Sequence, residues 1–310
     1  MSTTRLYAVF GNPILHSKSP FLFNSVFGEL GMDAFYTRIR PQSAADIIEL
    51  MRTMPIAGAN ITAPFKREVL DLVDVVSLDA EEIGAINTIV NSDGRLIGYN
   101  TDHYGVSQSF KEVGIDLLNS NCLVLGGGGA ARSAVYGLKR QGANVFICNR
   151  TISKAEQIAN DFGCTLMNWQ NFDCSFTFDV VVSTIVPDAI PCFIDSVKFK
   201  YLFDASYKPS MVYQIAQIKG AKIITGERWL LNQAIENFKL FFGDNPPQQT
   251  MEKGLSKKLN KDKISVLSYP QSKLSDIFES KADLVISAQG MEQQAINDIS
   301  DEETRKALIS

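Results

Sequence analysis

The sequence predicts an α/β protein of two domains, each built around a mostly parallel sheet, followed by a C-terminal extension. Three observations support this prediction. Apolar runs typical of strands alternate with amphipathic stretches typical of helices over residues 5–74. A second alternation covers residues 121–243. Four consecutive glycines, Gly126–Gly129, directly follow the first apolar run of that second half.

The first alternation predicts the first domain. The expected elements are a strand at 5–10, a helix at 21–31, a strand at 34–41, a helix at 43–54, a strand at 57–64 and a helix at 67–74. Residues 86–101 then read as a hairpin, because Asp93-Gly94 is a strong turn signal. We place a domain boundary near Asp102.

The second alternation predicts a domain inserted into the first. The expected strands are 121–126, 143–150, 178–185, 201–207 and 221–226, and the expected helices are 131–142, 153–163 and 227–243. We expect the last helix to cross back to the first domain. The first domain would then be residues 1–101 completed by about 234–245, and the inserted domain residues 102–233.

The composition is that of an ordinary globular protein. The 310 residues are 45% hydrophobic and 21% charged, with a net charge of −4, which indicates neither nucleic acid nor a membrane surface as a partner. The sequence has no apolar run of about 20 residues and no signal-peptide pattern at its start. Five cysteines without C-x-x-C spacing fit a reducing cytoplasm, and only two histidines argue against a zinc site. We expect a cytoplasmic protein without a metal.

The four glycines are typical of a dinucleotide-binding Rossmann unit. Gly126, Gly128 and Ala131 fit the G-x-G-x-x-G/A spacing between a strand and a helix. The first glycine permits the tight turn, the second allows a pyrophosphate to touch the backbone, and the small third residue lets helix and strand pack closely. The free N–H groups of the helix start then face the phosphates. The alternative is a glycine turn that binds nothing, as occurs in other folds. The candidate cofactor residues here are Gly126, Gly127, Gly128, Gly129, Ala130 and Ala131.

The residues after the next strand predict NADP rather than NAD. An acidic residue usually stands at this place in NAD-binding units and bonds the ribose 2′-hydroxyl. Here the chain has Asn149, Arg150 and Thr151, with Lys154 one helical turn further on. Arg150 can pair with a 2′-phosphate through two parallel hydrogen bonds, and Lys154 can add charge. The alternative is that both are solvated charges at a strand end.

Polar residues form three clusters near the predicted strands of the first domain. Ser17 and Ser19 stand before a helix, where one serine would suffice as a cap. Asn60 and Thr62 alternate along a strand and so point to one face, and Lys66 follows shortly after them. Taken alone, Lys66 would be a solvated lysine at a helix start.

The third polar cluster consists of Asn87, Asn100, Thr101 and Asp102. Asp102 could simply cap a helix. Together the three clusters predict a pocket of hydroxyls and amides with one lysine and one aspartate. Such a pocket suits a small polyhydroxylated acid, and with a hydride carrier bound nearby one lysine is enough to move the proton.

Seven segments in order make residues 5 to about 245 resemble shikimate dehydrogenase. These segments are "SKSP", "NITAPFK", "GAINTIV", "GYNTDHYG", "GGGGAAR", "CNRT" and "LLNQA". The resemblance implies reversible NADP-dependent reduction of 3-dehydroshikimate to shikimate, on the path to aromatic amino acids. It also implies a small-molecule substrate as the partner of a monomer or homodimer.

The resemblance further implies roles for individual residues. Lys66 and Asp102 would form the catalytic pair. The implied substrate-binding residues are Ser17, Ser19, Asn60, Thr62, Asn87, Tyr207 and Gln233, with the two serines and Tyr207 at the substrate carboxylate. Gly226 joins the candidate cofactor residues.

Two departures from the family pattern leave alternatives open. Phe23 stands where the family often has histidine, and Trp229 stands where it typically has methionine near the nicotinamide. Because Trp229 could relax substrate choice, a quinate/shikimate dehydrogenase of broader substrate or cofactor choice is one alternative. A catalytically silent NADP-binding regulatory homologue is another, although it would predict loss of Lys66 or Asp102, and both are present.

The extension at residues 250–310 has no predicted role. Residues 254–263 are polar and lysine-rich, which suggests a linker or an exposed helix, and 301–308 suggest a charged helix. Residues 264–290 read as strand, helix, strand and faintly resemble a segment of methylenetetrahydrofolate dehydrogenases. Such a unit cannot bury its own core. It would extend an existing sheet, pair with a second subunit, or be a remnant.

Overall fold

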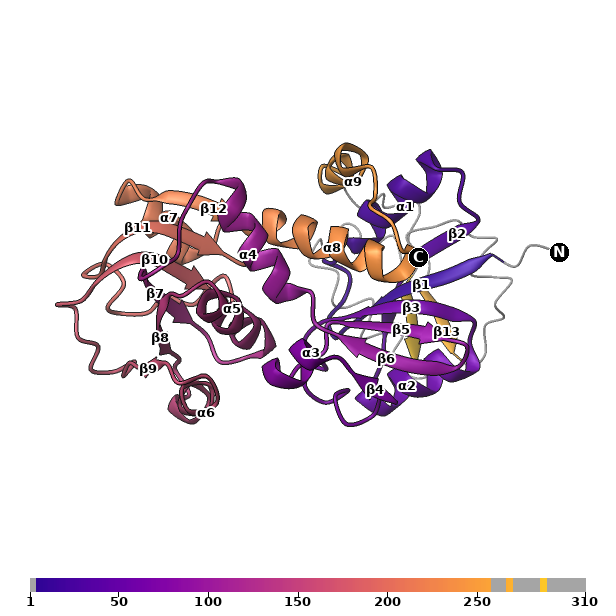
Figure 1. Ribbon diagram of the computed structural model, residues 1–310, viewed down its shortest axis with the longest axis horizontal. Helices are drawn as coiled ribbons and strands as arrows, with labels where there is room; N and C mark the ends of the chain where they lie inside the picture. Colours follow the sequence, from indigo (N-terminus) through magenta and orange to yellow (C-terminus); the bar gives the residue numbers. More distant parts are fainter. Residues whose placement is uncertain (1–3, 258–265, 270–284, 289–310) are drawn as a thin grey trace, which may run out of the picture. The chain divides into compact units, whose positions relative to one another are not determined.

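The computed structural model describes residues 4–257, 266–269 and 285–288. The chain divides into two compact units (Figure 1). Unit 1 comprises Met1–Asn100 and Asn237–Ser310, and unit 2 comprises Thr101–Glu236. Each is a sheet with helices packed on it, so the predicted α/β class is confirmed.

Unit 1 is built on a mixed eight-stranded sheet in the order β13-β14-β2-β1-β3-β5-β6-β4. All its pairings are parallel except those of β5 with β3 and with β6. The strands are β1 (Arg5–Phe10), β2 (Ala34–Arg40), β3 (Ile56–Ile61), β4 (Val75–Val76), β5 (Thr88–Ser92), β6 (Arg95–Tyr99), β13 (Val266–Tyr269) and β14 (Val285–Ala288). The helices are α1 (Ser19–Glu29), α2 (Ala44–Thr53), α3 (Leu78–Ile83), α9 (Gln248–Leu255) and the part of α8 (Gly226–Phe242) from Asn237 onward.

Two apolar layers hold unit 1 together. Ile47, Leu50 and Met51 of α2 pack with the sheet in one core cluster. An aromatic layer joins α1, the sheet and the end of α8. In this layer the Phe23 ring stacks on Tyr36 at 4.5 Å and lies 6.4 Å from Phe238. Phe23, the departure from the family pattern, is therefore a fully buried core residue.

The predicted helix at 67–74 is wrong. Residues 63–72 form a series of turns, and α3 follows them instead, capped by the Ser77 side chain. The backbone hydrogen bonds here do not keep one constant sequence separation. Val69 N bonds to Phe65 O, whereas Leu70 N bonds to Arg67 O. Phe65 and Val69 are both buried. The apolar spacing that resembles a helix therefore comes from turns that bury the same side chains.

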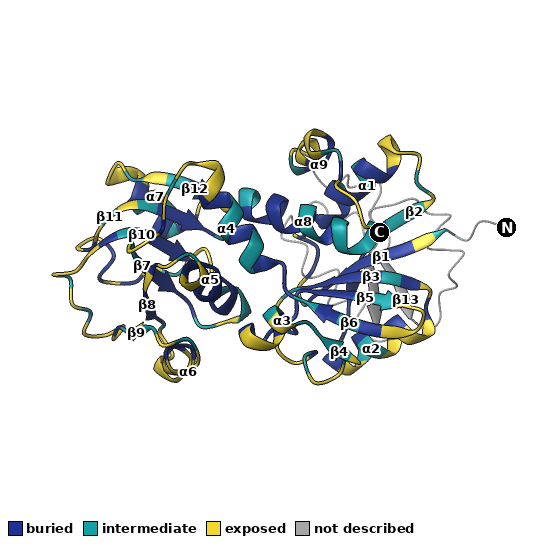
Figure 2. Cartoon of the chain, in the orientation of Figure 1, coloured by how far each residue is buried: buried dark blue, intermediate teal, exposed yellow. Residues whose placement is uncertain are grey.

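Unit 2 is a parallel six-stranded sheet in the order β12-β11-β10-β7-β8-β9. Its strands are β7 (Asn121–Leu125), β8 (Asn144–Cys148), β9 (Thr165–Leu166), β10 (Thr177–Ser183), β11 (Lys198–Asp204) and β12 (Lys222–Thr225). Its helices are α4 (Asp102–Glu112), α5 (Gly129–Arg140), α6 (Ile152–Phe162), α7 (Met211–Ile218) and α8 as far as Glu236. Two core clusters contain alternate residues of the central strands, and Figure 2 shows these strands buried and the outer face of α6 exposed.

The strand order of unit 2 is that of a Rossmann fold. From β7 the chain runs outward through β8 and β9, then returns to pair β10 on the other side of β7. The order therefore reverses between β7 and β10. In open α/β sheets, ligands bind at the carboxyl ends of the strands at such a switch point.

The C-terminal extension contributes two strands to unit 1. β14 pairs in parallel with β2, from Arg38 to Arg40, and β13 pairs with β14. The predicted strands are thus present, and they extend an existing sheet. The predicted helices between and after them lie outside the described residues. Most of the lysine-rich stretch also lies outside them, while its first residues belong to α9.

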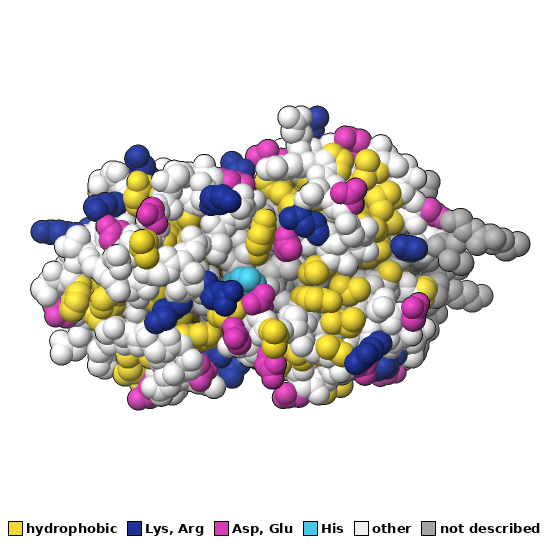
Figure 3. Space-filling model, viewed as in Figure 1, with side chains coloured by type: hydrophobic (Ala, Val, Ile, Leu, Met, Phe, Trp, Pro, Cys, Tyr) yellow, Lys and Arg dark blue, Asp and Glu magenta, His cyan; other side chains and the backbone are white. Residues whose placement is uncertain are grey.

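The surface charges are mixed, and the helices are those of a globular protein, as the composition indicates. On the face shown in Figure 3, acidic and basic side chains are interspersed. Among the described residues, none of the helices is both long and apolar enough to span a membrane.

Candidate active site

The candidate residues of unit 1 gather at one edge of its sheet. β1 and β3 run in parallel and end at this edge, β5 begins there and β6 ends there. The register places Asn60 opposite Thr88, and Thr88 opposite Tyr99. Residues that follow β1, β3 and β6 in the sequence are therefore brought together by the strand directions alone.

The loop after β1 carries the two serines. Ser17 and Ser19 are 7% and 5% exposed, and their hydroxyl oxygens lie 3.4 Å apart. Neither serine is the N-cap of α1, because Lys18 occupies that position and α1 begins at Ser19. Arg38 of β2 forms hydrogen bonds to the backbone of this loop. Its Nε and Nη2 donate to the Ser17 carbonyl oxygen at 3.1 and 2.5 Å.

A buried hydrogen-bond network connects the next candidate residues. The Tyr36 hydroxyl donates to Asn60 Oδ1 at 2.6 Å, and Asn60 Nδ2 donates to Thr88 Oγ1 at 3.1 Å. Thr88 Oγ1 in turn lies 2.9 Å from Asn87 Oδ1 and 2.5 Å from Asn237 Oδ1. Burial raises the pKa of Tyr36 well above its usual value, so its hydroxyl remains a donor. The network fixes the rotamers of Asn60 and Asn87 before any ligand binds.

Thr62 and Lys66 follow β3 on a segment tied to its neighbours. Thr62 N donates to Phe10 O at 2.8 Å, and Ile86 N donates to Lys66 O at 2.7 Å. Gly11 lies so close to Thr62 that an added Cβ would be 2.3 Å from Thr62 Cγ2. The two hydrogen bonds hold the backbone of this segment. The side chains of Thr62 and Lys66 are half-buried and so keep access to solvent.

The glycine turn of unit 2 has the form that a pyrophosphate requires. Gly126 has φ +132°, which only glycine adopts readily, and an added Cβ there would lie 2.1 Å from Thr184 Oγ1. Gly128 is the N-cap of α5, and a Cβ on it would meet nothing within 4 Å. No side chain caps this helix start. Open space thus lies over uncapped N–H groups at the switch point, which is the geometry that binds phosphate.

The residues after β8 lie at the surface next to this turn. Asn149 Nδ2 donates to Thr151 O at 2.9 Å, and Gly127 approaches Asn149 and Lys154 closely. The side chains of Arg150, Thr151 and Lys154 are exposed. Arg150 and Lys154 are cations beside this turn, and a cation can pair with a 2′-phosphate, so the residues present fit NADP.

Four further candidates lie elsewhere in unit 2. Asp102 is the first residue of α4 and is 7% exposed, so it does not serve as the N-cap, which is Thr101. Gln233 is buried and donates from Nε2 to Leu230 O at 2.9 Å. Tyr207 is 36% exposed, and partial burial together with the charges of Asp102 and Glu227 raises its pKa. A Cβ on Gly226 would lie 2.4 Å from Ala205 O, so close backbone packing explains this glycine.

The structure adds residues that the sequence did not indicate. Tyr36, Thr88, Asn237 and Arg38 support the candidates of unit 1, although each lies in a strand or helix that reads as core. Thr88 is adjacent to Asn87 in "INTIV", which is the one local signal. Asn237 lies 149 positions from Thr88 and gave no signal at all.

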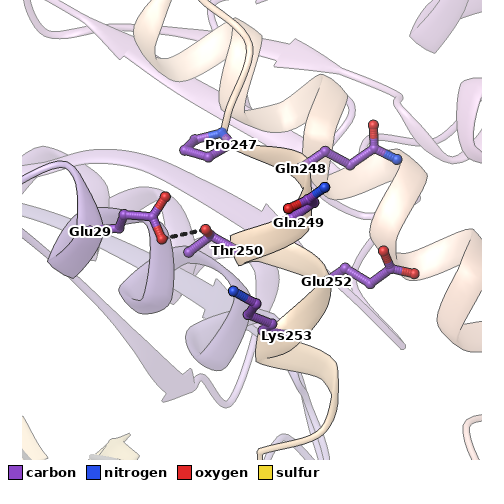
Figure 4. Close-up of a pocket in the computed structure, with 7 residues that line it drawn as sticks. All are labelled: Glu29, Pro247, Gln248, Gln249, Thr250, Glu252 and Lys253. Carbon is purple, nitrogen blue, oxygen red and sulfur yellow. Dashed lines mark hydrogen bonds between the residues drawn. The ribbon is translucent and has the colours of Figure 1, made fainter.

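The pocket shown in Figure 4 is separate from these residues. It is open, has a volume of about 600 Å³ and lies between α1 and α9. Its lining residues are Glu29, Pro247, Gln248, Gln249, Thr250, Glu252 and Lys253. Thr250 Oγ1 donates to Glu29 Oε2 at 2.5 Å across it. None of the predicted site residues lines this pocket, and we place the site at the sheet edge. Within the described part of the chain, no His, Cys, Asp or Glu cluster could hold a metal ion.

Comparisons with known proteins agree on one family. The profile described as shikimate dehydrogenase substrate binding domain matches residues 9–89, and that described as shikimate / quinate 5-dehydrogenase matches residues 108–205. A shikimate dehydrogenase (NADP(+)) of Aquifex aeolicus is 35% identical over 260 residues, which cover 81% of this chain and 96% of the relative. One of Nitrosopumilus maritimus is 34% identical over 268 residues, covering 81% of this chain and 98% of the relative.

Solved structures give the same result. Shikimate dehydrogenase from Aquifex aeolicus has a TM-score of 0.75 and 33% identity, and the match covers 83% of this chain and all of that one. Shikimate 5-dehydrogenase from Thermus thermophilus, solved in complex with NADP(H) and shikimate, has a TM-score of 0.73 and 30% identity, over 81% of this chain and 98% of that one. The Aquifex protein is thus matched along its whole length while part of this chain is left over.

Proposed function

The chain belongs to the shikimate dehydrogenase family, and we propose that it catalyses the reversible NADPH-dependent reduction of 3-dehydroshikimate to shikimate, with Lys66 and Asp102 as the catalytic pair. The observation that carries the proposal is the group of hydroxyl, amide and ammonium side chains at the carboxyl edge of the unit 1 sheet. The reaction places the enzyme in aromatic amino acid biosynthesis, as an NADP-dependent oxidoreductase.

We assign the domains accordingly. Residues 1–101, completed by about 234–245, form the substrate domain, and residues 102–233 form the NADP domain. Residues 250–310 form the extension. The division of the chain into units at Thr101 and Asn237 supports these boundaries.

NADP binds at the glycine turn of unit 2. The backbone of Gly126–Gly129, with Ala130 and Ala131, takes the pyrophosphate, because the uncapped start of α5 offers N–H donors to an anion. Asn149, Arg150, Thr151 and Lys154 take the ribose and its 2′-phosphate, and Gly226 contributes close to the nicotinamide end. When bound, this cofactor supplies the hydride.

The substrate carboxylate and hydroxyls bind to neutral polar groups. Ser17 and Ser19 hold the carboxylate with Tyr207 beside them. Asn60, Thr62, Asn87 and Gln233 bond the ring hydroxyls or the carboxylate. Neutral polar side chains suit this task, because a buried hydroxyl needs a hydrogen-bond partner held in a fixed position. A buried polar group without such a partner raises the free energy of the complex. The network around Thr88 supports this assignment, because it holds Asn60 and Asn87 in one orientation.

Lys66 moves the proton. As hydride reaches the C3 carbonyl carbon, negative charge develops on the carbonyl oxygen, and Lys66 Nζ donates a proton to it. In the reverse direction the amine of Lys66 accepts the proton from the C3 hydroxyl. Asp102 is the carboxylate partner that holds the lysine and a substrate hydroxyl in line for this transfer. A positioned acid–base group of this kind contributes about 10² to 10⁴ in rate.

Absorbance at 340 nm tests the function directly. Purified protein is mixed with shikimate or quinate, each with NADP or NAD. We expect turnover with shikimate and NADP. Comparable turnover with quinate or NAD would instead indicate a dehydrogenase of broader choice. Absence of turnover from folded protein that still binds NADP would contradict the proposal and favour a regulatory homologue.

We also propose a cytoplasmic location and a monomer or homodimer in solution. All five cysteines are free thiols, which fits a reducing compartment. Size-exclusion chromatography with light scattering gives the mass of the assembly.

A further inference from the structure

Trp229 lies where its side chain contacts the first turn of α4. It is 6% exposed, and its ring centroid is 5.2 Å from that of Phe203 in the core of unit 2. Its indole Nε1 donates a hydrogen bond of 3.0 Å to the main-chain oxygen of Asp102. The side chain therefore makes one polar contact, and that contact is to the backbone of the proposed catalytic residue.

The contact depends on a close approach of α4 and α8 at Gly105. A Cβ added there would lie 2.8 Å from Trp229 Cδ1, 3.0 Å from Trp229 O and 3.1 Å from Gln233 Cβ. Any other residue at this position would push the helices apart. Gly105 therefore allows the indole to lie flat enough against α4 to reach Asp102.

Further polar contacts between α8 and α4 lie along the rest of α4. Asn232 Nδ2 donates to Ser109 Oγ at 3.1 Å and lies 3.3 Å from Glu112 Oε2. Arg228 Nε lies 3.4 Å from the same carboxylate. The body of α4 is thus fixed to α8 at several points. Its first turn packs on α5 through the His103 and Tyr136 rings, 5.2 Å apart, and Trp229 adds a hydrogen bond to the main chain there.

A contact at the first turn of a helix limits the motion of that turn. Helix ends fray, because the first N–H groups of a helix have no partners within it. The indole N–H bonds to the main chain of Asp102 and so limits the motion of the Cα from which the catalytic carboxylate extends. A displacement of about 1 Å at a catalytic group is enough to lower the rate strongly.

We propose that Trp229 is a positioning residue, whose indole N–H holds the main chain of Asp102 and thereby the place of its carboxylate. This inference rests on the catalytic role of Asp102 proposed above. Trp229 itself transfers no proton and needs no contact with substrate for this role.

Trp229→Phe tests the proposal, because it keeps an aromatic ring against Phe203 and removes the N–H. We expect kcat to fall roughly three- to tenfold, which corresponds to the loss of one net hydrogen bond, while the KM for shikimate and the Kd for NADPH change less than twofold. The matched control is Trp169→Phe. Trp169 belongs to the same unit and packs on Phe193 at 5.4 Å, so its kcat should equal that of the wild type.

A double-mutant cycle with Asp102→Asn separates positioning from general packing. If Trp229 acts through Asp102, adding Trp229→Phe to Asp102→Asn causes no further loss of kcat. Gly105→Ala displaces the indole from the other side of the contact, so it should also lower kcat in the wild type.

Each other outcome has a definite meaning. A Trp229→Phe enzyme with the kcat of Trp169→Phe would overturn the proposal, as would losses that simply multiply in the cycle. An Asp102→Asn enzyme with wild-type kcat would overturn the role of Asp102 and this inference with it. A wild-type protein that does not oxidise shikimate would contradict the proposed function itself.

Discussion

Replacing Thr88 by valine removes the central hydroxyl of the buried network while keeping the shape of the side chain. Thr88 is fully buried in β5. Its Oγ1 accepts from Asn60 Nδ2 and lies within hydrogen-bond distance of the amide oxygens of Asn87 and Asn237. Because a hydroxyl has one proton, the change removes one donated and one accepted bond.

The size of the effect follows from the partners left behind. A net hydrogen bond stabilises by about 1 kcal/mol, and a buried group left without a partner costs about 1–3 kcal/mol. Asn60 Nδ2 keeps a bond of 3.3 Å to Asn87 O, so the cost comes from the bonds that Thr88 itself makes. We expect Thr88→Val to lower the free energy of unfolding by roughly 2–3 kcal/mol, and the Tm by about 5–10 °C.

Thermal unfolding followed by circular dichroism measures the stability, and steady-state kinetics measures the site. We expect the KM for shikimate to rise, because Asn60 and Asn87 lose a fixed orientation. Thr53→Val is the control, since Thr53 is exposed and its hydroxyl donates to Glu49 O of its own helix at 2.8 Å. Its Tm should stay near that of the wild type. If Thr88→Val leaves both Tm and KM at their wild-type values, the network does not order the site and the reasoning is refuted.

Three further predictions concern the cofactor, the extension and the thiols. Arg150→Ala should raise the KM for NADPH about tenfold or more and leave turnover with NADH unchanged; equal effects on both cofactors would contradict the 2′-phosphate role. A chain ending at Lys257 lacks β13 and β14, so the edge of β2 is exposed. This chain should have a lower Tm and should self-associate, as light scattering would show. An unchanged Tm and an unchanged mass would contradict the pairing of β14 with β2. At pH 8, iodoacetamide should label the exposed Cys192 and not the buried Cys122 or Cys148, and peptide mass mapping would show which thiols react. Burial raises the pKa of both buried thiols to about 12, so their thiolate forms only as the pH approaches that value. Rapid labelling of Cys122 and Cys148 would refute this.

Much of the fold could be predicted because local signals agree with the global structure. Asp93 and Gly94 both adopt positive φ, at 52° and 88°, as the hairpin turn between β5 and β6 requires. Ser43 forms a capping box with Asp46 at the start of α2. The central strands β7, β8 and β10 of unit 2 are largely buried on both faces, so they read as short apolar runs.

Other elements were missed because their sequence signals are ambiguous. Residues 63–72 bury the same side chains that a helix would bury, and periodicity alone does not separate the two. α7 was not predicted, although Ser210 caps it, and α9 begins after Pro247 in a stretch that looked like the end of the family match.

The site shows the same division between local and distant information. Glycine spacing and the residues after β8 indicate the cofactor within one βαβ unit. The support for Asn60 and Asn87 comes from Tyr36 and Asn237, which lie far away in sequence and read as core residues. The contact of Trp229 with Asp102 spans 127 positions and depends on the missing Cβ of Gly105. Contacts of this kind follow from packing and have no local pattern.

The steady-state kinetics of Lys66→Ala test the central claim most directly. Lys66 is proposed to transfer the proton at the C3 oxygen, so its loss should lower kcat by roughly 10² to 10⁴ while the KM for shikimate changes only a few-fold. A Kd for NADPH equal to that of the wild type would show that the cofactor unit is intact. A variant that keeps the wild-type kcat and shows only a raised KM would make Lys66 a binding residue and would contradict the proposed mechanism.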